Sequence, residues 1–269
     1  MTTLIEISDP HNPITYTGKL VASNKSNVQE WCILDTDEGE MLFINNTLQS
    51  SMNDEVNYHE MFVHSLMSGC RKPKNVLILG GSEGCMVREV LKWNVDSVTQ
   101  VDWDETLISY FKGAGASWNS NSYDDPRVTV VICEALEWLN GCTQKFDCIF
   151  IDLFDPTETT CDFMNIIVHK CKGLLSDGGG LSVNAGAYSK LIMGPDNFDG
   201  MMKCDVPSFK EDWTFLMILP KLWSVYIHEK VLPTLKYYSK ERLIKSLVSK
   251  KLTPPITPNF VEPGSHYGC

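Results

Sequence analysis

The stretch Asn75-Val-Leu-Ile-Leu-Gly-Gly-Ser-Glu-Gly84 joins a short apolar strand to a glycine-rich turn. Such a strand is typical of a parallel sheet that is buried on both faces. Glycine-rich turns after a first strand usually bind phosphate, because free N–H groups at the start of the next helix attract anions. Here Glu83 places a carboxylate inside the turn, where it would repel a pyrophosphate. We therefore expect a nucleoside-like ligand that carries a positive charge, such as a sulfonium.

Composition limits the classes of protein that the chain can represent. Its 269 residues, 43% of them hydrophobic, suffice for one large α/β domain with a small appendage. The formal net charge of −11 disfavours nucleic acid and anionic membranes as partners. The same charge favours cationic ligands through long-range attraction, although simple solubility is an alternative explanation.

Cysteine usage indicates a reducing compartment. None of the ten cysteines forms a Cys-x-x-Cys pair or a Cys/His cluster with zinc-ligand spacing, so we predict no metal site. The sequence shows no signal peptide and no apolar run near eighteen residues. We expect a soluble, cytoplasmic protein with free thiols.

The pattern of elements changes near residue 57. Residues 1–57 contain short β-prone segments at 14–21, 29–35 and 40–44, separated by turn-forming residues, which predicts a small antiparallel β module. Helical spacing of apolar residues begins at 57–66. We place the second domain at 58–269, ending in an irregular, proline-rich tail from Thr253.

Strands and helices alternate through the second domain. This alternation predicts an α/β, Rossmann-like, doubly wound and mostly parallel sheet. A late strand at 213–219 is interpreted as an antiparallel edge strand. The other expected strands are 75–79, 96–101, 127–133, 146–151 and 180–184, and the helices are 85–93, 105–113, 135–141 and 163–174.

Carboxylates follow four successive strands of this predicted sheet. Glu83, Asp102 and Glu134 follow the first three strands, and Asp152 ends the fourth, with Asp155 three residues later. A single acid in a loop is usually a solvated turn former. Together, however, these acids lie at the carboxyl ends of strands, where ligands bind in such sheets. We expect a shared site in which Asp102 and Glu134 bind a nucleoside, and Glu83 and Asp152 face a cationic tail.

Several short motifs make this pattern specific. They are Tyr58-His-Glu-Met61, Gly80-Gly-Ser-Glu-Gly84, Asp124-Asp-Pro-Arg-Val128, Asp152-Leu-Phe-Asp-Pro156 and Val206-Pro-Ser-Phe209 with Trp213. With these motifs the chain resembles the polyamine aminopropyltransferases, meaning spermidine synthase and its relatives. The resemblance runs from about residue 40 to 217, and a weaker similarity is found at 235–238. Within the family it is more similar to the thermospermine synthase and broad-specificity prokaryotic branch.

The resemblance implies a co-substrate, decarboxylated S-adenosylmethionine, and no permanently bound cofactor. Asp102 would hold the ribose hydroxyls and Glu134 would accept from the adenine amino group. Glu83 and His59 would lie by the aminopropyl tail. The full set implied to bind this co-substrate is Gln29, Gln49, His59, Gly80, Gly81, Glu83, Asp102 and Glu134.

The resemblance also implies how the acceptor is handled. Asp152 and Tyr58 would be catalytic and act on the attacking amine, while Asp155, Tyr58 and Glu83 would bind the polyamine. The acceptor would be putrescine, spermidine or agmatine, and the by-product methylthioadenosine. Relatives pair through their N-terminal β modules, so the resemblance implies a homodimer.

The chain departs from the family pattern at four places. Ser82 replaces the third glycine of the turn, and Met52 stands where relatives often carry a glutamate. The loop at 157–161 is short, and 185–206 is too short for the helix and strand that relatives place there, which predicts a sheet trimmed on that side. Two alternatives stay open: a catalytically weak homologue that acts as a binding or regulatory subunit, and an S-adenosylmethionine methyltransferase.

Overall fold

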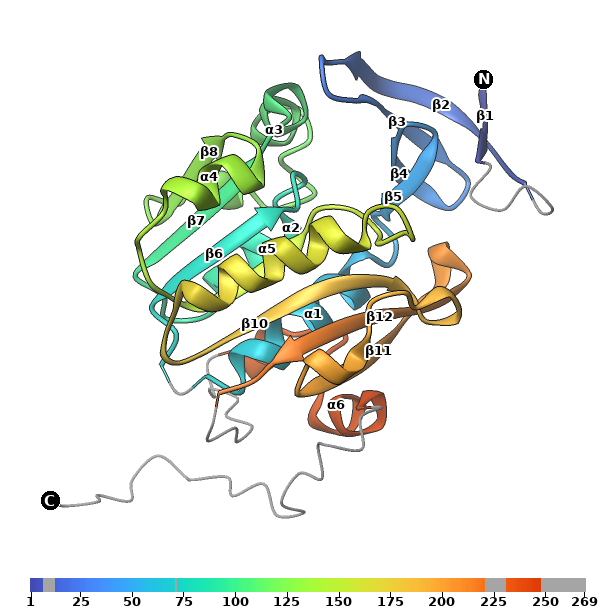
Figure 1. Cartoon of the computed structure of the whole chain (residues 1–269). Coiled ribbons are helices and arrows are strands. Elements are labelled where there is room, and N and C mark those ends of the chain that lie inside the picture. Colours follow the sequence, from blue (N-terminus) through green and yellow to red (C-terminus); the bar gives the residue numbers. More distant parts are fainter. Residues whose placement is uncertain (7–12, 71, 221–230, 248–269) are drawn as a thin grey trace, which may run out of the picture.

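The computed structural model describes residues 1–6, 13–70, 72–220 and 231–247. In this part of the chain there are two β-sheets, one of five strands and one of seven (Figure 1). The smaller sheet lies beyond the carboxyl ends of the parallel strands of the larger one (Figure 1). The predicted proline-rich tail falls outside the described residues.

The smaller sheet is an antiparallel meander in the order β1-β2-β3-β4-β5. It confirms the predicted β module, and adds two short outer strands that the sequence reading missed. Its central strands bury apolar side chains in two separate clusters, one with Ile33 and Leu42 and the other with Leu34 and Phe43. The strands are β1 (Thr2–Glu6), β2 (Ile14–Lys25), β3 (Glu30–Thr36), β4 (Gly39–Ile44) and β5 (Thr47–Ser51).

The larger sheet has the order β11-β12-β10-β9-β6-β7-β8. Five strands, from β10 to β8 in this order, are parallel, and β12 runs antiparallel to both β10 and β11. This confirms the mostly parallel, Rossmann-like fold. The strands are β6 (Asn75–Gly80), β7 (Ser97–Asp102), β8 (Val128–Ile132), β9 (Phe146–Asp152), β10 (Leu175–Ala187), β11 (Gly200–Val206) and β12 (Glu211–Ile218).

The predicted trimming of the sheet is wrong. No α-helix occurs within 185–206, all of which is described, but the chain returns there as β11, which pairs with β12 along its whole length. Two 3-10 turns, Tyr188–Lys190 and Pro195–Asn197, replace the helix. Buried side chains alternate along β11, and this period of two marks a strand. The late strand is therefore internal, and β11 forms the edge.

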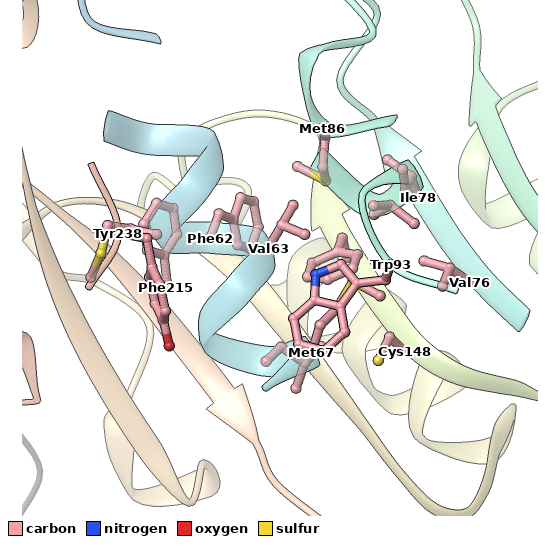
Figure 2. Packing of buried hydrophobic residues seen from close by; sticks show 14 of the residues in the cluster. Phe62, Val63, Met67, Val76, Ile78, Met86, Trp93, Cys148, Phe215 and Tyr238 are labelled. Carbon is pink, nitrogen blue, oxygen red and sulfur yellow. The ribbon is translucent and has the colours of Figure 1, made fainter. Parts of the chain in front are cut away.

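Helices cover both faces of the larger sheet and bury a separate apolar cluster on each. On one face Phe62 of α1 stacks on Phe215 of β12, with ring centroids 4.3 Å apart (Figure 2). On the other face Met164 and Ile167 of α5 are fully buried. The helices are α1 (Glu55–Met67), α2 (Cys85–Leu91), α3 (Glu105–Lys112), α4 (Ala135–Gly141), α5 (Cys161–Gly173) and α6 (Lys240–Ser246). In the described ranges, no helix is both long and apolar enough to span a bilayer.

A buried carboxylate fixes helix α1 to the C-terminal part of the chain. Glu60 is fully buried and accepts hydrogen bonds from the backbone N–H groups of Lys236, Tyr237 and Tyr238 at 2.7–2.8 Å. The Lys92 ammonium lies 3.5 Å from the same carboxylate. These donors satisfy a charge that would otherwise be costly to bury. Through Glu60, helix α1 is therefore fixed to the segment 236–238.

Candidate active site

A cavity of about 150 Å³ lies at the carboxyl ends of the parallel strands, between the two sheets. This is where ligands bind in open α/β sheets. Of the eleven residues predicted for the site, all of them described, only His59 does not line this cavity. The ten that do are Gln29, Gln49, Tyr58, Gly80, Gly81, Glu83, Asp102, Glu134, Asp152 and Asp155.

The glycine turn brings the ends of β6 and β9 into close contact. Gly80 and Gly81 have φ angles of +83° and +67°, which glycine adopts without strain. A Cβ on Gly80 would lie 2.0 Å from the carbonyl oxygen of Asp152, so a side chain cannot be accommodated there. Ser82, the departure from the family pattern, is not among the positive-φ residues of the described chain, and its hydroxyl bonds the Asp102 carboxylate.

Three side chains that the sequence reading missed hold the turn in place by bonding its carbonyl groups. Gln100 Nε2 donates to the carbonyl oxygens of Gly80 and Gly81 at 2.8 and 2.7 Å. Asn119 Nδ2 donates to the Glu83 carbonyl at 2.9 Å, and the Tyr123 hydroxyl donates to the Ser82 carbonyl at 2.8 Å. The only sequence signal was a polar residue inside a buried strand, which is Gln100.

Asp152 and Tyr58 form the shortest hydrogen bond among the cavity side chains. The Tyr58 hydroxyl donates to Asp152 Oδ1 at 2.6 Å. Burial, and then the nearby Glu83 carboxylate, raise the pKa of Asp152 to about 7, although the bond from Tyr58 opposes the rise. Burial and the Asp152 charge also raise the pKa of Tyr58, so it remains a neutral donor. Asp152 can therefore exchange a proton near neutral pH, as a general base requires.

Asp155 is positioned by a chain of hydrogen bonds from β10 and β12. Asn184 Nδ2 donates to Asp155 Oδ1 at 3.1 Å. Asn184 Oδ1 in turn accepts from Trp213 Nε1 and from the backbone N–H of Gly186, both at 2.9 Å. Asn184 also lines the cavity and was missed by the sequence reading, because a strand asparagine has no motif of its own.

The two acids predicted to bind a nucleoside lie at the ends of β7 and just beyond β8. Burial raises the pKa of Asp102 to about 6, against bonds from the backbone N–H of Asp104 and from Ser82. Glu134 caps α4, because its carboxylate accepts from the backbone N–H of Glu137 at 2.8 Å. Trp103 also lines the cavity, with 48% of its surface exposed, and had not been predicted.

His59 lies behind the cavity wall and contacts it through Glu83. His59 Nε2 is 3.0 Å from Glu83 Oε1, and its Nδ1 is 2.8 Å from Glu55 Oε2. Glu55, His59 and Cys85 have ligand atoms within 4.8 Å of one another, a spacing that could hold a metal ion. Arg88, however, pairs with both Glu55 oxygens at 2.8 and 2.9 Å, so a cation already neutralises this carboxylate. We read the group as an ion-pair network.

The fold and the site define a Rossmann-like α/β protein with an acidic cavity. Comparison of the sequence with known protein families agrees with this class. The sequence model of the family described as "Spermine/spermidine synthase domain" matches residues 55–231. The chain therefore belongs to the spermine/spermidine synthase family, as its motifs predicted.

Curated relatives of the chain include polyamine aminopropyltransferases from archaea. The chain is 37% identical over 173 residues to a polyamine aminopropyltransferase of Saccharolobus islandicus, and 31% identical over 192 residues to one of Korarchaeum cryptofilum. These matches cover 62% and 66% of this chain, and 58% and 59% of the relatives. The chain thus matches less than two thirds of the length of these relatives.

Solved structures share the fold at low sequence identity. A spermidine synthase from Thermotoga maritima superposes with a TM-score of 0.80 at 24% identity, over 93% of this chain and 91% of that one. A spermidine synthase in complex with the transition-state analogue AdoDATO gives a TM-score of 0.81 at 24% identity, over 92% of each chain. Both likenesses concern the fold of the described sheets and helices.

The raised pKa of Asp152 predicts a pH-dependent stability. Because the pKa is about 7 in the folded protein and about 3.9 in an unfolded chain, ionising Asp152 destabilises the fold. This cost is complete above pH 7 and fades as the pH falls toward 4. We expect Asp152→Asn to raise the melting temperature at pH 8 more than at pH 5, as measured by calorimetry. The exposed Asp177→Asn is the control, and an equal effect of Asp152→Asn at both pH values would contradict the assignment.

Proposed function

We propose that the protein transfers an aminopropyl group from decarboxylated S-adenosylmethionine to a primary amine of a di- or polyamine, such as putrescine, spermidine or agmatine. The observation that carries the proposal is the convergence of carboxylates from four neighbouring strand ends on one cavity. Two cationic reactants must meet there, and each needs anionic contacts. The names of the archaeal relatives support the same reaction class.

The reaction is an in-line displacement at the carbon beside the sulfonium. The amine lone pair forms the new C–N bond, the C–S bond breaks, and its electron pair leaves with sulfur as the neutral thioether, methylthioadenosine. The attacking nitrogen then loses a proton. A primary amine with a pKa of roughly 10 is mostly protonated at neutral pH, and supplying the neutral form costs on the order of 4 kcal/mol.

Asp152 is the base in this proposal. An ordinary carboxylate would attract the ammonium and keep it protonated. Burial and Glu83 raise the pKa of Asp152 to about 7, which makes the neutral amine with a protonated Asp152 more accessible. Tyr58 donates to Oδ1, and thereby orients the carboxyl group. Phe62, Phe209 and Phe215 pack against the Tyr58 ring at 5.0–6.3 Å and fix its position.

The donor occupies the half of the cavity between the glycine turn and the N-terminal sheet. Asp102 binds the ribose hydroxyls and Glu134 the adenine amino group, with Gln29 and Gln49 reaching in from the smaller sheet. Glu83 faces the aminopropyl tail. Ordinary S-adenosylmethionine carries a carboxylate on that tail, which Glu83 would repel, so this residue disfavours a methyltransferase.

The acceptor extends from Asp152 past Asp155 into a second cavity of about 310 Å³. The two cavities share Leu48, Asp155, Phe209 and Trp213 as wall residues. A diamine needs one distal anion, which Asp155 supplies. A triamine needs further length, which the second cavity offers.

We further propose that the protein is cytoplasmic and works as a homodimer that pairs through the smaller sheet. Leu20 and Val21 on β2 are 43% and 44% exposed, and pairing would cover them. Light scattering at micromolar concentration should give twice the mass of one chain; a monomer would exclude this assembly.

Asp152→Asn tests the proposed chemistry directly. We expect methylthioadenosine formation, followed by mass spectrometry, to fall by roughly 10²–10⁴-fold, because the amine loses its base. Calorimetry should show that the variant still binds the decarboxylated donor, and that the wild type prefers it to S-adenosylmethionine. Unaltered turnover would show that another group is the base. No product from the wild type with any acceptor would favour a binding or regulatory homologue.

Ala187→Phe tests the path of the acceptor. Ala187 is 9% exposed and lines the second cavity but not the first. A phenylalanine there should fill the space beyond Asp155, so kcat/KM should fall for spermidine and stay near the wild-type value for putrescine. The diamine serves as the internal control for folding. Equal losses with both acceptors would place the acceptor elsewhere.

A further inference from the structure

His59 is held between two carboxylates. Its side chain is 2% exposed. Nδ1 lies 2.8 Å from Glu55 Oε2 and 2.8 Å from the Glu55 carbonyl oxygen, and Nε2 lies 3.0 Å from Glu83 Oε1. An imidazolium can donate from both ring nitrogens, to the Glu55 side on Nδ1 and to Glu83 on Nε2. Two acidic partners favour this doubly protonated ring, and we therefore treat His59 as an imidazolium.

The side of this cation away from the cavity is rigidly anchored. Glu55 binds the Arg88 guanidinium through both oxygens, and Arg88 also donates to the Trp118 carbonyl at 2.7 Å. These contacts tie α1 to α2 and to the segment after α3. His59 therefore cannot leave Glu55 without breaking a paired, largely buried network, and its Nε2–H stays directed at Glu83.

The groups around His59 and Asp152 are mostly acids. Asp152 faces Glu83 from the glycine turn, Asp155 from the following loop, and Tyr58 and His59 from α1. His59 faces Glu55, Glu83 and the buried Cys85 thiol, whose own pKa is raised by burial. Burial alone would lower the pKa of His59, but the bonds to Glu55 and Glu83 raise it to about 10. Its positive charge acts against the rise in the pKa of Asp152.

We propose that His59 is a positioning residue, a buried cation that holds the Glu83 side chain toward the cavity and acts through its charge on the neighbouring Asp152. This inference rests on the proposed transfer reaction. It replaces the role predicted from family resemblance, in which His59 lies by the donor's tail. An imidazolium that already donates both protons has no acceptor to offer an ammonium.

The arrangement divides two tasks between neighbouring acids. Glu83, held in place by His59, faces the tail of the donor. Asp152, which has no cation of its own in hydrogen-bond contact among the described residues, takes and releases the proton. Without the charge of His59, Asp152 would hold its proton more tightly, and Glu83 would lose the contact that orients its side chain.

His59→Gln separates charge from hydrogen bonding, since a glutamine amide can still donate to Glu83 but carries no charge. We expect donor affinity, measured by calorimetry with decarboxylated S-adenosylmethionine at pH 7.5, to fall roughly tenfold with loss of the charged bond. The acid limb of the kcat/KM profile should move up by roughly one pH unit. At pH 9 the variant's kcat should recover toward the wild-type value.

His64→Gln is the matched control. His64 is a buried histidine on the same helix, bonded to Glu89 at 2.9 Å and away from the cavity. A purely structural role predicts that both variants lower the melting temperature and leave the pH profile in place. If the His59→Gln profile overlays that of His64→Gln and the wild type, the proposal is overturned.

A measurement on the wild-type protein avoids the risk of misfolding. In nitrogen-15 histidine spectra at pH 8, both ring nitrogens of His59 should be protonated, whereas a neutral ring would overturn the proposal. This readout and donor binding need no turnover. If the wild type forms no methylthioadenosine, the proposed reaction is wrong. The histidine spectrum and the donor affinity would still test the role of His59.

Discussion

The contact between Gly80 and the backbone of Asp152 is the constraint on which the site depends. Residues 80 and 152 are paired at the ends of adjacent parallel strands, and no side chain fits at position 80. The chain can therefore turn sharply after β6 and place Glu83 beside the end of β9. A substitution at Gly80 would push apart the two strand ends that carry the acidic pair. Gly80 sets the geometry of the turn, whereas Glu83 and Asp152 contribute the carboxyl groups.

The carboxylates that line the cavity have different environments, because some are mainly desolvated and one is paired with a histidine. Asp102 and Asp152 are pushed toward neutrality by desolvation, whereas Glu83 is paired with a histidine that is itself bound to Glu55. Desolvation makes a buried carboxylate easier to protonate, whereas a cation in contact has the opposite effect. Among the described residues, Glu83 has His59 in hydrogen-bond contact, whereas burial dominates the environments of Asp102 and Asp152, so the acids of one cavity differ from one another. Perturbed groups of this kind often mark functional sites.

The sequence predicted the parts of the fold that depend on local pattern. The parallel strands and the convergence of Glu83, Asp102 and Asp152 followed from the rule that strand ends share one edge of the sheet. Strand β11 was missed because family length, and not its own alternation of buried residues, guided the reading. The role of Asn184 depends on how β10 and β12 pair, and local sequence carries no signal for that register.

The position of the His59 side chain is a second feature that local sequence does not predict. The family resemblance carried by the motif at 58–61 implied that both Tyr58 and His59 would lie by the ligand. In the helix, successive residues point about 100° apart, so Tyr58 reaches Asp152 while His59 turns toward Glu83 and Glu55. Which of the two lines the cavity depends on the packing of α1 against α2, which only the folded chain reveals.

Glu60, the next residue of α1, extends these contacts away from the cavity. Its carboxylate is satisfied by three backbone N–H groups from 236–238, a segment far along the chain. Tyr58, His59 and Glu60 therefore connect Asp152, Glu83 and the 236–238 segment through one turn of helix α1. A chain that ended before Lys236 would leave the buried Glu60 carboxylate without these donors, in the same helical turn as Tyr58 and His59. Although remote in sequence, this segment therefore supports the part of α1 that faces the cavity.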